Sequence, residues 1–212
     1  MRGTVGASLA VLLFAASLSG CTAVTDAISG NDSADVPVWE VGDWWLYTFS
    51  TPEYTDDTAR LVVASVSEES GTANMLAISS LTEARRHAVL NHNPFLGRIT
   101  HEDLAAFENG VAQPVMEFPL EKDNSWGFTL FSIEWRASVI DLSSDYVTIR
   151  ADSDDGGRID YVYDRSAGFF SSFIWKDSAG IEQMRMMLAD NGGGHTGDVY
   201  FVRGGDLYSD TW

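Results

Sequence analysis

The chain has 212 residues, of which 31 are Asp or Glu and 13 are Lys or Arg, so its formal charge at pH 7 is −18. Such an excess of carboxylates argues against nucleic acid or an anionic membrane face as a polyvalent partner, because both require clustered Lys and Arg. Hydrophobic residues make up 45% and aromatic residues 12%, so the chain can build a core and is not expected to be disordered.

The first twenty residues have the features of a secretory signal peptide. Arg2 supplies a positive charge, and residues 5–18 are apolar and uncharged, a segment too short and wrongly flanked to be a spanning helix. The next residues, Leu18-Ser19-Gly20-Cys21, resemble the lipobox of prokaryotic lipoproteins. That resemblance implies cleavage before Cys21, a lipid on its thiol, and an extracytoplasmic protein held at the cell membrane by that lipid. The alternative is an ordinary secreted protein with an unpaired cysteine.

Cys21 is the single cysteine of the chain, so no intramolecular disulfide is available and the domain must be held together by packing. A lipidated thiol cannot also be a catalytic one. The sequence contains no nucleophile elbow, zinc-protease helix, phosphate loop or dinucleotide fingerprint. We therefore predict no catalytic residue and no cofactor.

The domain organisation follows from composition. Residues 21–38 are small, polar and acidic, which is typical of a flexible tether. A single β-rich domain is expected over residues 39–205, followed by a tail at 206–212. Trp45 and Trp126 each lead an aromatic strand, which suggests two similar halves, 39–117 and 118–205; the alternative is a chance match between aromatic-rich strands.

Short segments with alternating or β-branched hydrophobic residues recur at regular spacing, with turn residues between them. This pattern predicts a mainly β fold, an antiparallel meander that forms a curved sheet or half-barrel. The expected strands are 44–49, 61–66, 75–78, 86–90, 126–130, 133–139, 146–150, 158–163, 169–175, 181–188 and 198–203.

One segment departs from this pattern and predicts a short helix at residues 100–109. Thr100 is a capping residue with Asp103 three positions later, Leu104 and Phe107 are spaced as on a helix face, and Gly110 is a suitable C-terminal cap. We expect this helix to cover one end of the sheet.

Two groups of residues contain possible metal ligands. His87, His92 and His101 lie close together with Glu102 and Asp103, but their spacing fits no zinc pattern, so surface histidines are the favoured interpretation.

The loop from Asp152 to Gly157 has the glycine that a calcium-binding EF-hand loop needs at its sixth position. The twelfth position, however, is Tyr163 instead of glutamate. A hairpin turn explains the same residues, so no metal site is predicted.

Large aromatic residues occur in adjacent positions of the predicted strands, at Trp44-Trp45 and Phe169-Phe170. Successive residues of a strand point to opposite faces, so both faces must be covered there, or one must line an apolar groove. The candidate groove-lining residues are Trp135, Trp175, Met184 and Met186. The alternative is that these side chains belong to a packed core.

The strand order, with a hairpin at 161–168 followed by the strand at 169–175, resembles the half-barrel lipoproteins of cell envelopes, such as the outer-membrane lipoprotein carriers. In that family a curved antiparallel sheet, closed by helical segments, holds acyl chains. The opening formed by Trp39, Val41, Gly42, Asp43, Trp45 and Tyr47 is also similar to that of uncharacterised archaeal and bacterial surface lipoproteins. That likeness implies a compartment and no activity.

Three hypotheses follow. The first is a lipid-anchored, extracytoplasmic β-domain that binds an apolar or amphipathic ligand as a carrier, chaperone or accessory protein. The second is a surface protein-interaction module with a packed core and no ligand pocket. The third, for which the sequence offers no catalytic residue, is an anchored hydrolase.

Overall fold

The computed structural model describes residues 33–53, 57–67, 72–79 and 93–196. In this part of the chain the structure is built from strands, turns and loops, with no helix. The strands are β1 (Ser33–Ala34), β2 (Trp44–Ser50), β3 (Asp57–Ser67), β4 (Thr72–Ser79), β5 (Gly97–Thr100), β6 (Ala106–Glu108), β7 (Val111–Gln113), β8 (Leu120–Glu121), β9 (Ser125–Leu130), β10 (Ile133–Leu142), β11 (Tyr146–Ser153), β12 (Arg158–Asp164), β13 (Phe169–Lys176) and β14 (Glu182–Gly192).

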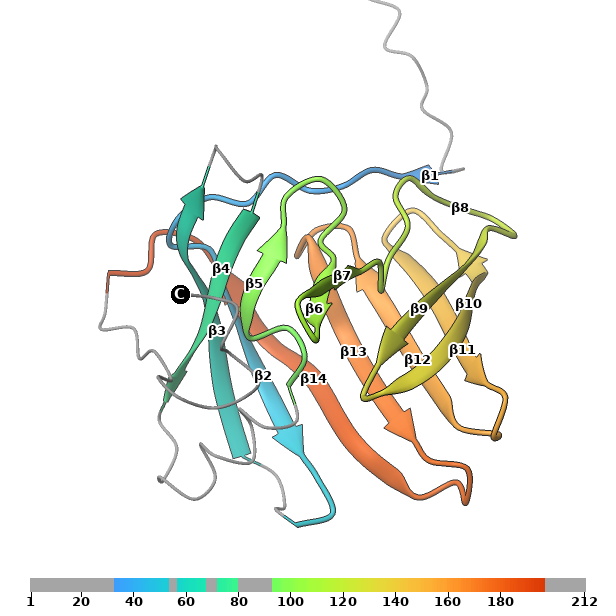
Figure 1. The fold of residues 1–212 in the computed structure, drawn as a ribbon. Helices are drawn as coiled ribbons and strands as arrows, with labels where there is room; N and C mark the ends of the chain where they lie inside the picture. Colours follow the sequence, from blue (N-terminus) through green and yellow to red (C-terminus); the bar gives the residue numbers. More distant parts are fainter. Residues whose placement is uncertain (1–32, 54–56, 68–71, 80–92, 197–212) are drawn as a thin grey trace, which may run out of the picture.

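Ten of these strands form one antiparallel sheet in the order β5-β4-β3-β2-β14-β13-β12-β11-β10-β9. The order consists of two meanders, β2 to β5 and β9 to β14, joined where β14 pairs with β2. The predicted mainly β, antiparallel meander is confirmed. Figure 1 shows the sheet curving, with the hairpin β6–β7 lying on its open side between the two edge strands β5 and β9.

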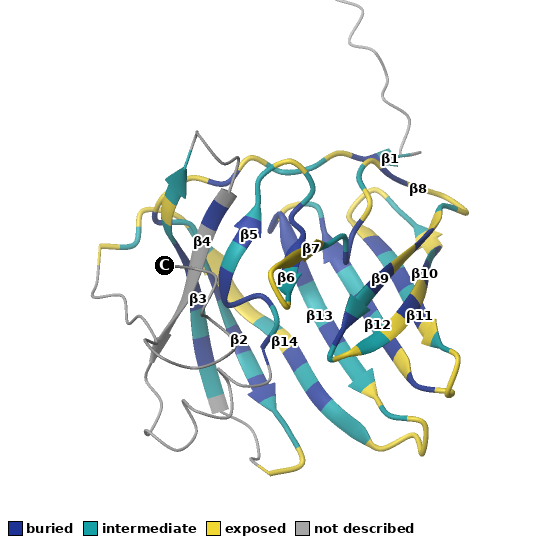
Figure 2. Ribbon diagram, viewed as in Figure 1, coloured by how far each residue is buried: buried dark blue, intermediate teal, exposed yellow. Residues whose placement is uncertain are grey.

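The core lies on the concave side of this curved sheet. In β2 every second residue is buried, namely Trp45, Tyr47 and Phe49, as the two-residue period of a strand requires. The same alternation continues through β9 to β12, and Figure 2 shows it as bands of buried residues along the strands. Hydrophobic burial on one face is therefore what fixes the register of the sheet.

A β-bulge explains why Phe169 and Phe170 are both buried. The register between β12 and β13 shifts at Val162/Tyr163, so that Val162 pairs with Ser172 and Tyr163 pairs with Phe170. The extra residue, Ser171, takes up the change of face, and both rings can enter the core.

The predicted helix at residues 100–109 is wrong. Its Thr100 ends β5 and accepts a hydrogen bond from the amide of Ala105 at its side-chain oxygen, at 2.7 Å, within a tight loop. Asn109 and Gly110, with φ angles of 50° and 78°, form the two-residue turn between β6 and β7. Asn-Gly is a strong hairpin signal because both residues tolerate positive φ, and here it is a hairpin turn instead of a helix cap.

The folded part of the chain also begins earlier than expected. Ser33 and Ala34, assigned to the flexible tether at 21–38, form β1 and pair with Glu121 and Leu120 of β8. Residues 35–43, which we call the strap, then cross one end of the sheet to reach β2 (Figure 1). The strap is fixed by Trp39, whose indole N–H donates to the carbonyl of Gly168 at 3.1 Å.

The two Trp-led strands take unequal places in the sheet. β2, with Trp45, lies in the middle between β3 and β14, whereas β9, with Trp126, is an edge strand. The predicted strands at 86–90 and 198–203 lie outside the described residues, as does the tail at 206–212.

Candidate functional site

The four residues predicted to line an apolar groove all face the concave side of the sheet, but they do not line an open groove. Trp135 is 1% exposed, and Met184 and Met186 are 0% exposed. Met184 lies opposite Trp175, and Met186 lies opposite Phe173. The structure places three of the four side chains inside packed core.

Trp175 is the only one of the four that is partly exposed. Its ring stacks on Phe131, with centroids 4.1 Å apart and planes 5° from parallel. Phe131 and Ser132 form the tight turn between β9 and β10, with φ angles of 58° and 60°. The hairpin thus holds the Phe131 ring against Trp175. The indole nitrogen of Trp175 is buried and finds no hydrogen-bond partner in the described part of the chain.

The middle of the concave side is filled by interlocking rings. Phe170 packs against Phe95 at 4.8 Å and against Tyr161 at 5.7 Å between centroids, and Phe173 packs against both of those rings. The hydroxyl of Tyr161 donates to the carbonyl of Val115 at 2.6 Å. Val115 lies in the segment that follows the β6–β7 hairpin, so this bond joins the sheet to its cover.

Burial also changes the acidity of the tyrosines on this side. Removal from water raises the pKa of Tyr47 and Tyr161 well above the ordinary value, and the nearby carboxylate of Asp164 adds to the rise at Tyr47. Desolvation raises the pKa of Tyr163 to about 12. These phenols are neutral structural groups at physiological pH.

Asp164 is the one buried carboxylate among the residues that the structure describes. Its Oδ1 accepts hydrogen bonds from the amides of Ser166 and Ala167 and from the hydroxyl of Ser166, at 2.7–3.0 Å. The carboxylate therefore shapes the turn between β12 and β13. It is satisfied by its own turn and gives no support to a catalytic role.

The hairpin β6–β7 covers the open side of the sheet and contacts the edge strand β9 through side chains. Gln113 accepts a hydrogen bond from the amide of Thr129 at 2.7 Å. Glu108 accepts one from the amide of Ser132 at 2.8 Å. The side-chain oxygen of Gln113 thus stands where the carbonyl of a neighbouring strand would be, whereas Glu108 holds the turn after β9.

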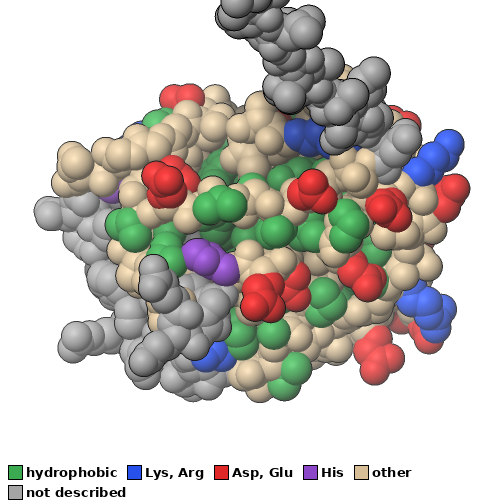
Figure 3. Space-filling model, turned by 90° about the horizontal axis from the view of Figure 1, so that it is seen from above, with side chains coloured by type: hydrophobic (Ala, Val, Ile, Leu, Met, Phe, Trp, Pro, Cys, Tyr) green, Lys and Arg blue, Asp and Glu red, His purple; other side chains and the backbone are tan. Residues whose placement is uncertain are grey.

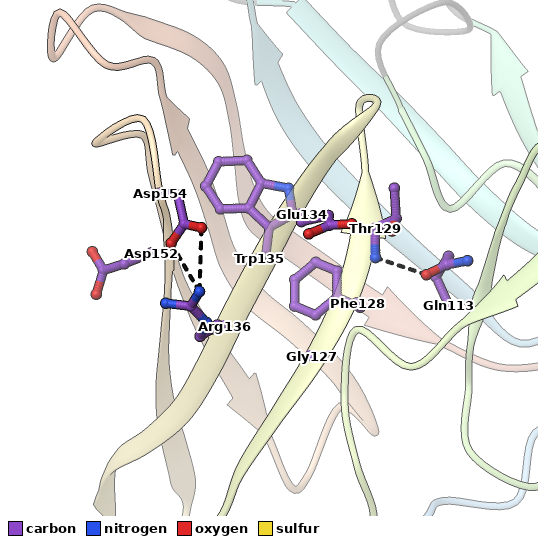
Figure 4. A pocket seen from close by; sticks show the side chains of 9 residues that line it. All are labelled: Gln113, Gly127, Phe128, Thr129, Glu134, Trp135, Arg136, Asp152 and Asp154. Carbon is purple, nitrogen blue, oxygen red and sulfur yellow. Dashed lines mark hydrogen bonds and ion pairs between the residues drawn. The ribbon is translucent and has the colours of Figure 1, made fainter.

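A depression of about 340 Å³ lies beside Gln113, on the outer face of β9 and β10 (Figure 4). Gly127 supplies no side chain there. The depression is lined by Gln113, Gly127, Phe128, Thr129, Glu134, Trp135, Arg136, Asp152 and Asp154. Arg136 bonds Asp154 at 2.9 Å, with both side chains about four-fifths exposed. Trp135 borders the depression but is too deeply buried to offer its ring there.

A second depression, of about 270 Å³, lies between the strap and the turn at 165–168. Arg165 lines it and donates from Nη1 to the carbonyl of Ser33 at 2.6 Å. Trp39 and Trp45 also line it, but both are buried, and the indole of Trp45 donates to Ala167 at 2.8 Å. This bond and that of Trp39 to Gly168 attach the strap and β2 to the turn.

The part of the chain that is described contains no group of three or more His, Cys, Asp or Glu residues that could hold a metal ion. His101 lies in the loop after β5, while His87 and His92 lie outside the described residues. The segment from Asp152 to Gly157 forms the turn between β11 and β12. There the hydroxyl of Ser153 donates to Asp155 and lowers the pKa of that carboxyl.

Cys21 also lies outside the described residues, so its lipidation stays a prediction. Among the residues that are described, no helix is long and apolar enough to cross a membrane. Comparison with protein-family models, with curated proteins and with solved structures gave no match.

Proposed function

We propose that the chain is a lipid-anchored, extracytoplasmic β-domain that acts through its outer surface, as an interaction module for another protein. The observation that carries this proposal is the filled concave side. A carrier of apolar ligands needs a cavity, and ligand sites enclose a few hundred Å³ of largely apolar space. Here Trp135, Met184 and Met186 occupy that side and are at most 1% exposed.

The place where the chain enters the described domain, at β1, is compatible with a lipid anchor on Cys21. β1 lies at the end of the sheet that the strap crosses, and Cys21 precedes Ser33 by 12 residues. An extended chain of that length spans at most about 40 Å. A lipid on Cys21 would therefore keep this end nearest the membrane while leaving room between them.

The charge of the surface at that end is compatible with a gap between the domain and the membrane. Figure 3 looks onto it and shows hydrophobic side chains in the middle, Asp and Glu around them, and Lys and Arg toward the margin. Carboxylates are repelled by anionic lipid headgroups within about one Debye length. We infer that a partner protein binds the outer face or an edge of the sheet, and not the end that faces the membrane.

One observation favours the alternative, a binder of apolar ligands. Trp175 is partly exposed, and its buried indole nitrogen finds no partner among the described residues. If the ring of Phe131 moved away from Trp175, the space next to Met184 would open. An apolar ligand would then compete with Phe131 for the face of Trp175.

A titration with a fluorescent acyl probe separates the two functions. The intact mature protein should show no saturable change in tryptophan emission when a dansyl-labelled fatty acid is added, because buried side chains fill the concave side in the described part of the chain. Saturable one-to-one binding, weakened by Trp175→Ala and not by Ile140→Ala on the exposed outer face, would contradict the proposal and favour the ligand carrier.

A further inference from the structure

The edge strand β9 has a defined set of backbone groups on its free side. The two-residue turn at Phe131 and Ser132 makes Leu130 and Ile133 a hydrogen-bonded pair, and such pairs alternate along an antiparallel ladder. The amide and carbonyl groups of Ser125, Gly127 and Thr129 therefore point away from β10. The bond from the Thr129 amide to Gln113 runs in that direction.

Most of this edge has no cover among the described residues. Natural edge strands are usually blunted by charged side chains, by proline or by a covering segment. In β9 the residues that alternate onto the outer face are Ser125, Gly127 and Thr129, which are small and uncharged. Ser125 and Gly127 are exposed, and neither makes a hydrogen bond to a described segment other than β10. In the part of the chain that the structure describes, Gln113 covers the edge only at Thr129.

The depression lies where the side chain of an added strand would go. Cross-strand neighbours in a sheet share a face, so a guest residue paired with Gly127 would lay its side chain over the outer face of β9 and β10. Gly127 leaves that space open: a Cβ built on it meets nothing closer than 3.6 Å. The volume of about 340 Å³ accommodates a long side chain there.

The charges that line the depression favour a basic side chain on the guest residue. Glu134, Asp152 and Asp154 line the depression against a single cation, Arg136. Arg136 bonds Asp154, and Arg158 bonds Asp152 at 2.9 Å, which leaves Glu134 available. In a chain of charge −18, a Lys or Arg that reaches Glu134 is attracted both locally and at long range.

We propose that the free edge of β9 is the docking site of this module, and that it takes an extended segment of a partner protein as an added strand, with Lys or Arg opposite Gly127. The inference rests on the proposed function and names the site and the partner's chemistry. The backbone of Gly127 and Ser125 supplies hydrogen bonds, and the depression supplies selectivity, as in other cases of strand addition. A second copy of this chain is disfavoured, because edge-to-edge pairing would bring two acidic depressions together.

The test uses the intact mature protein and an array of seven-residue peptides built from Thr and Val, with Lys, Arg, Ser or Glu at the centre. Binding is measured by fluorescence anisotropy. Peptides with central Lys or Arg should bind at least tenfold more tightly than the Glu peptide. The variant Glu134→Lys, at an exposed position, should reverse that preference. Absence of any preference for basic peptides, or an unchanged preference in Glu134→Lys, would overturn the proposal.

Two further variants separate the edge from general electrostatics. Gly127→Pro removes an outward-pointing N–H and should abolish binding without breaking the β9–β10 ladder. If that variant fails to fold, Gly127→Glu takes its place. Its carboxylate adds negative charge to the acidic depression and fills it, so peptide binding should weaken at least tenfold. The matched control, Glu40→Gln with Glu102→Gln, removes two exposed negative charges elsewhere and should change affinity less than twofold. Equal losses in the control and in the Gly127 variant would contradict a site at β9.

The outcomes also distinguish the two proposals. If neither the peptides nor the acyl probe binds, the proposed docking site at β9 is wrong, but the proposal that the protein acts through its outer surface still stands. Saturable acyl binding removes the surface-action proposal itself. A dimer in solution that is abolished by Gly127→Pro would assign the edge to a second copy and overturn the choice of partner.

Discussion

Tyr47, Tyr161 and Tyr163 lie on the concave side of the sheet, where their hydroxyl groups are shielded from water. Burial raises the pKa of each above its value in the unfolded chain, to about 12 for Tyr163. The folded state therefore holds these protons more tightly than the unfolded state. The stability that they confer is fully present below pH 10 and is lost as the pH rises through the folded-state pKa.

We thus expect the free energy of unfolding in urea to fall steeply between about pH 10 and 12. Tyr163→Phe should make this fall shallower, because it removes one of the raised groups. Tyr146→Phe, at an exposed position on β11, is the matched control for the loss of one phenol hydroxyl. A pH profile that is the same in both variants would mean that Tyr163 is not buried in solution.

Trp135 tests whether the concave side is core. The ring is 1% exposed, and its N–H donates to the carbonyl of Leu130 at 2.9 Å. Trp135→Ala should lower the free energy of unfolding by about 3–5 kcal/mol, and Trp135→Phe by less, since it keeps most of the packing. Ile140→Ala, at an exposed position, should stay within about 0.5 kcal/mol. A Trp135→Ala loss near that of Ile140→Ala would show that the ring faces open space.

At the scale of elements, the strap and the turn between β12 and β13 depend on one glycine. Gly168 has a φ of 65°, and a Cβ built on it would lie 3.2 Å from Cβ of Pro37 in the strap. Gly180, in the turn between β13 and β14, has a φ of 76° but open space around it.

This pair of glycines gives a direct comparison. Gly180→Ala should cost about 1–2 kcal/mol for the left-handed backbone alone. Gly168→Ala should cost more, because the added methyl also displaces Pro37 from the turn. Thermal unfolding of the two variants checks the order. If Gly168→Ala were the milder of the two, the strap would not be packed against this turn.

The strands that could be predicted are those in which a local pattern decides the structure. Residues 133–139, 146–150 and 158–163 alternate cleanly, and they lie within β10, β11 and β12. Their pattern reflects burial on one face, which any neighbouring strand would require. The helix predicted at 100–109 failed because Asn109-Gly110 suits a hairpin turn as well as a helix end, and pairing of β6 with β7 decided between them.

Contacts between segments far apart in the chain could not be predicted from local sequence patterns. The two halves of the sheet join by pairing of β14 with β2, more than 130 residues apart, and no local signal specifies that. Trp135, Met184 and Met186 were predicted to line a groove, but whether that face is open depends on Phe95, Phe170 and other rings from distant segments. Gln113 was missed because its role arises from its position beside β9.

At the scale of the whole molecule, the anchoring proposal depends on Cys21. Cys21→Ser removes the thiol that a lipid would occupy, so the protein should leave the membrane fraction or stay unprocessed. Partitioning between detergent and aqueous phases, with the mass of the mature chain, measures this. Ser19→Ala, which keeps the cysteine, is the control. A Cys21→Ser protein that is cleaved and still partitions with detergent would contradict lipidation at this residue.

Native mass spectrometry of the protein, purified gently from the cells that produce it, tests directly whether its interior is packed. We expect the mass of the processed chain with the lipid proposed for Cys21 and no further apolar molecule. A reproducible, non-covalent adduct in the mass range of a lipid, retained by the native protein and lost on unfolding, would contradict it. The concave side would then be a ligand site that opens in solution.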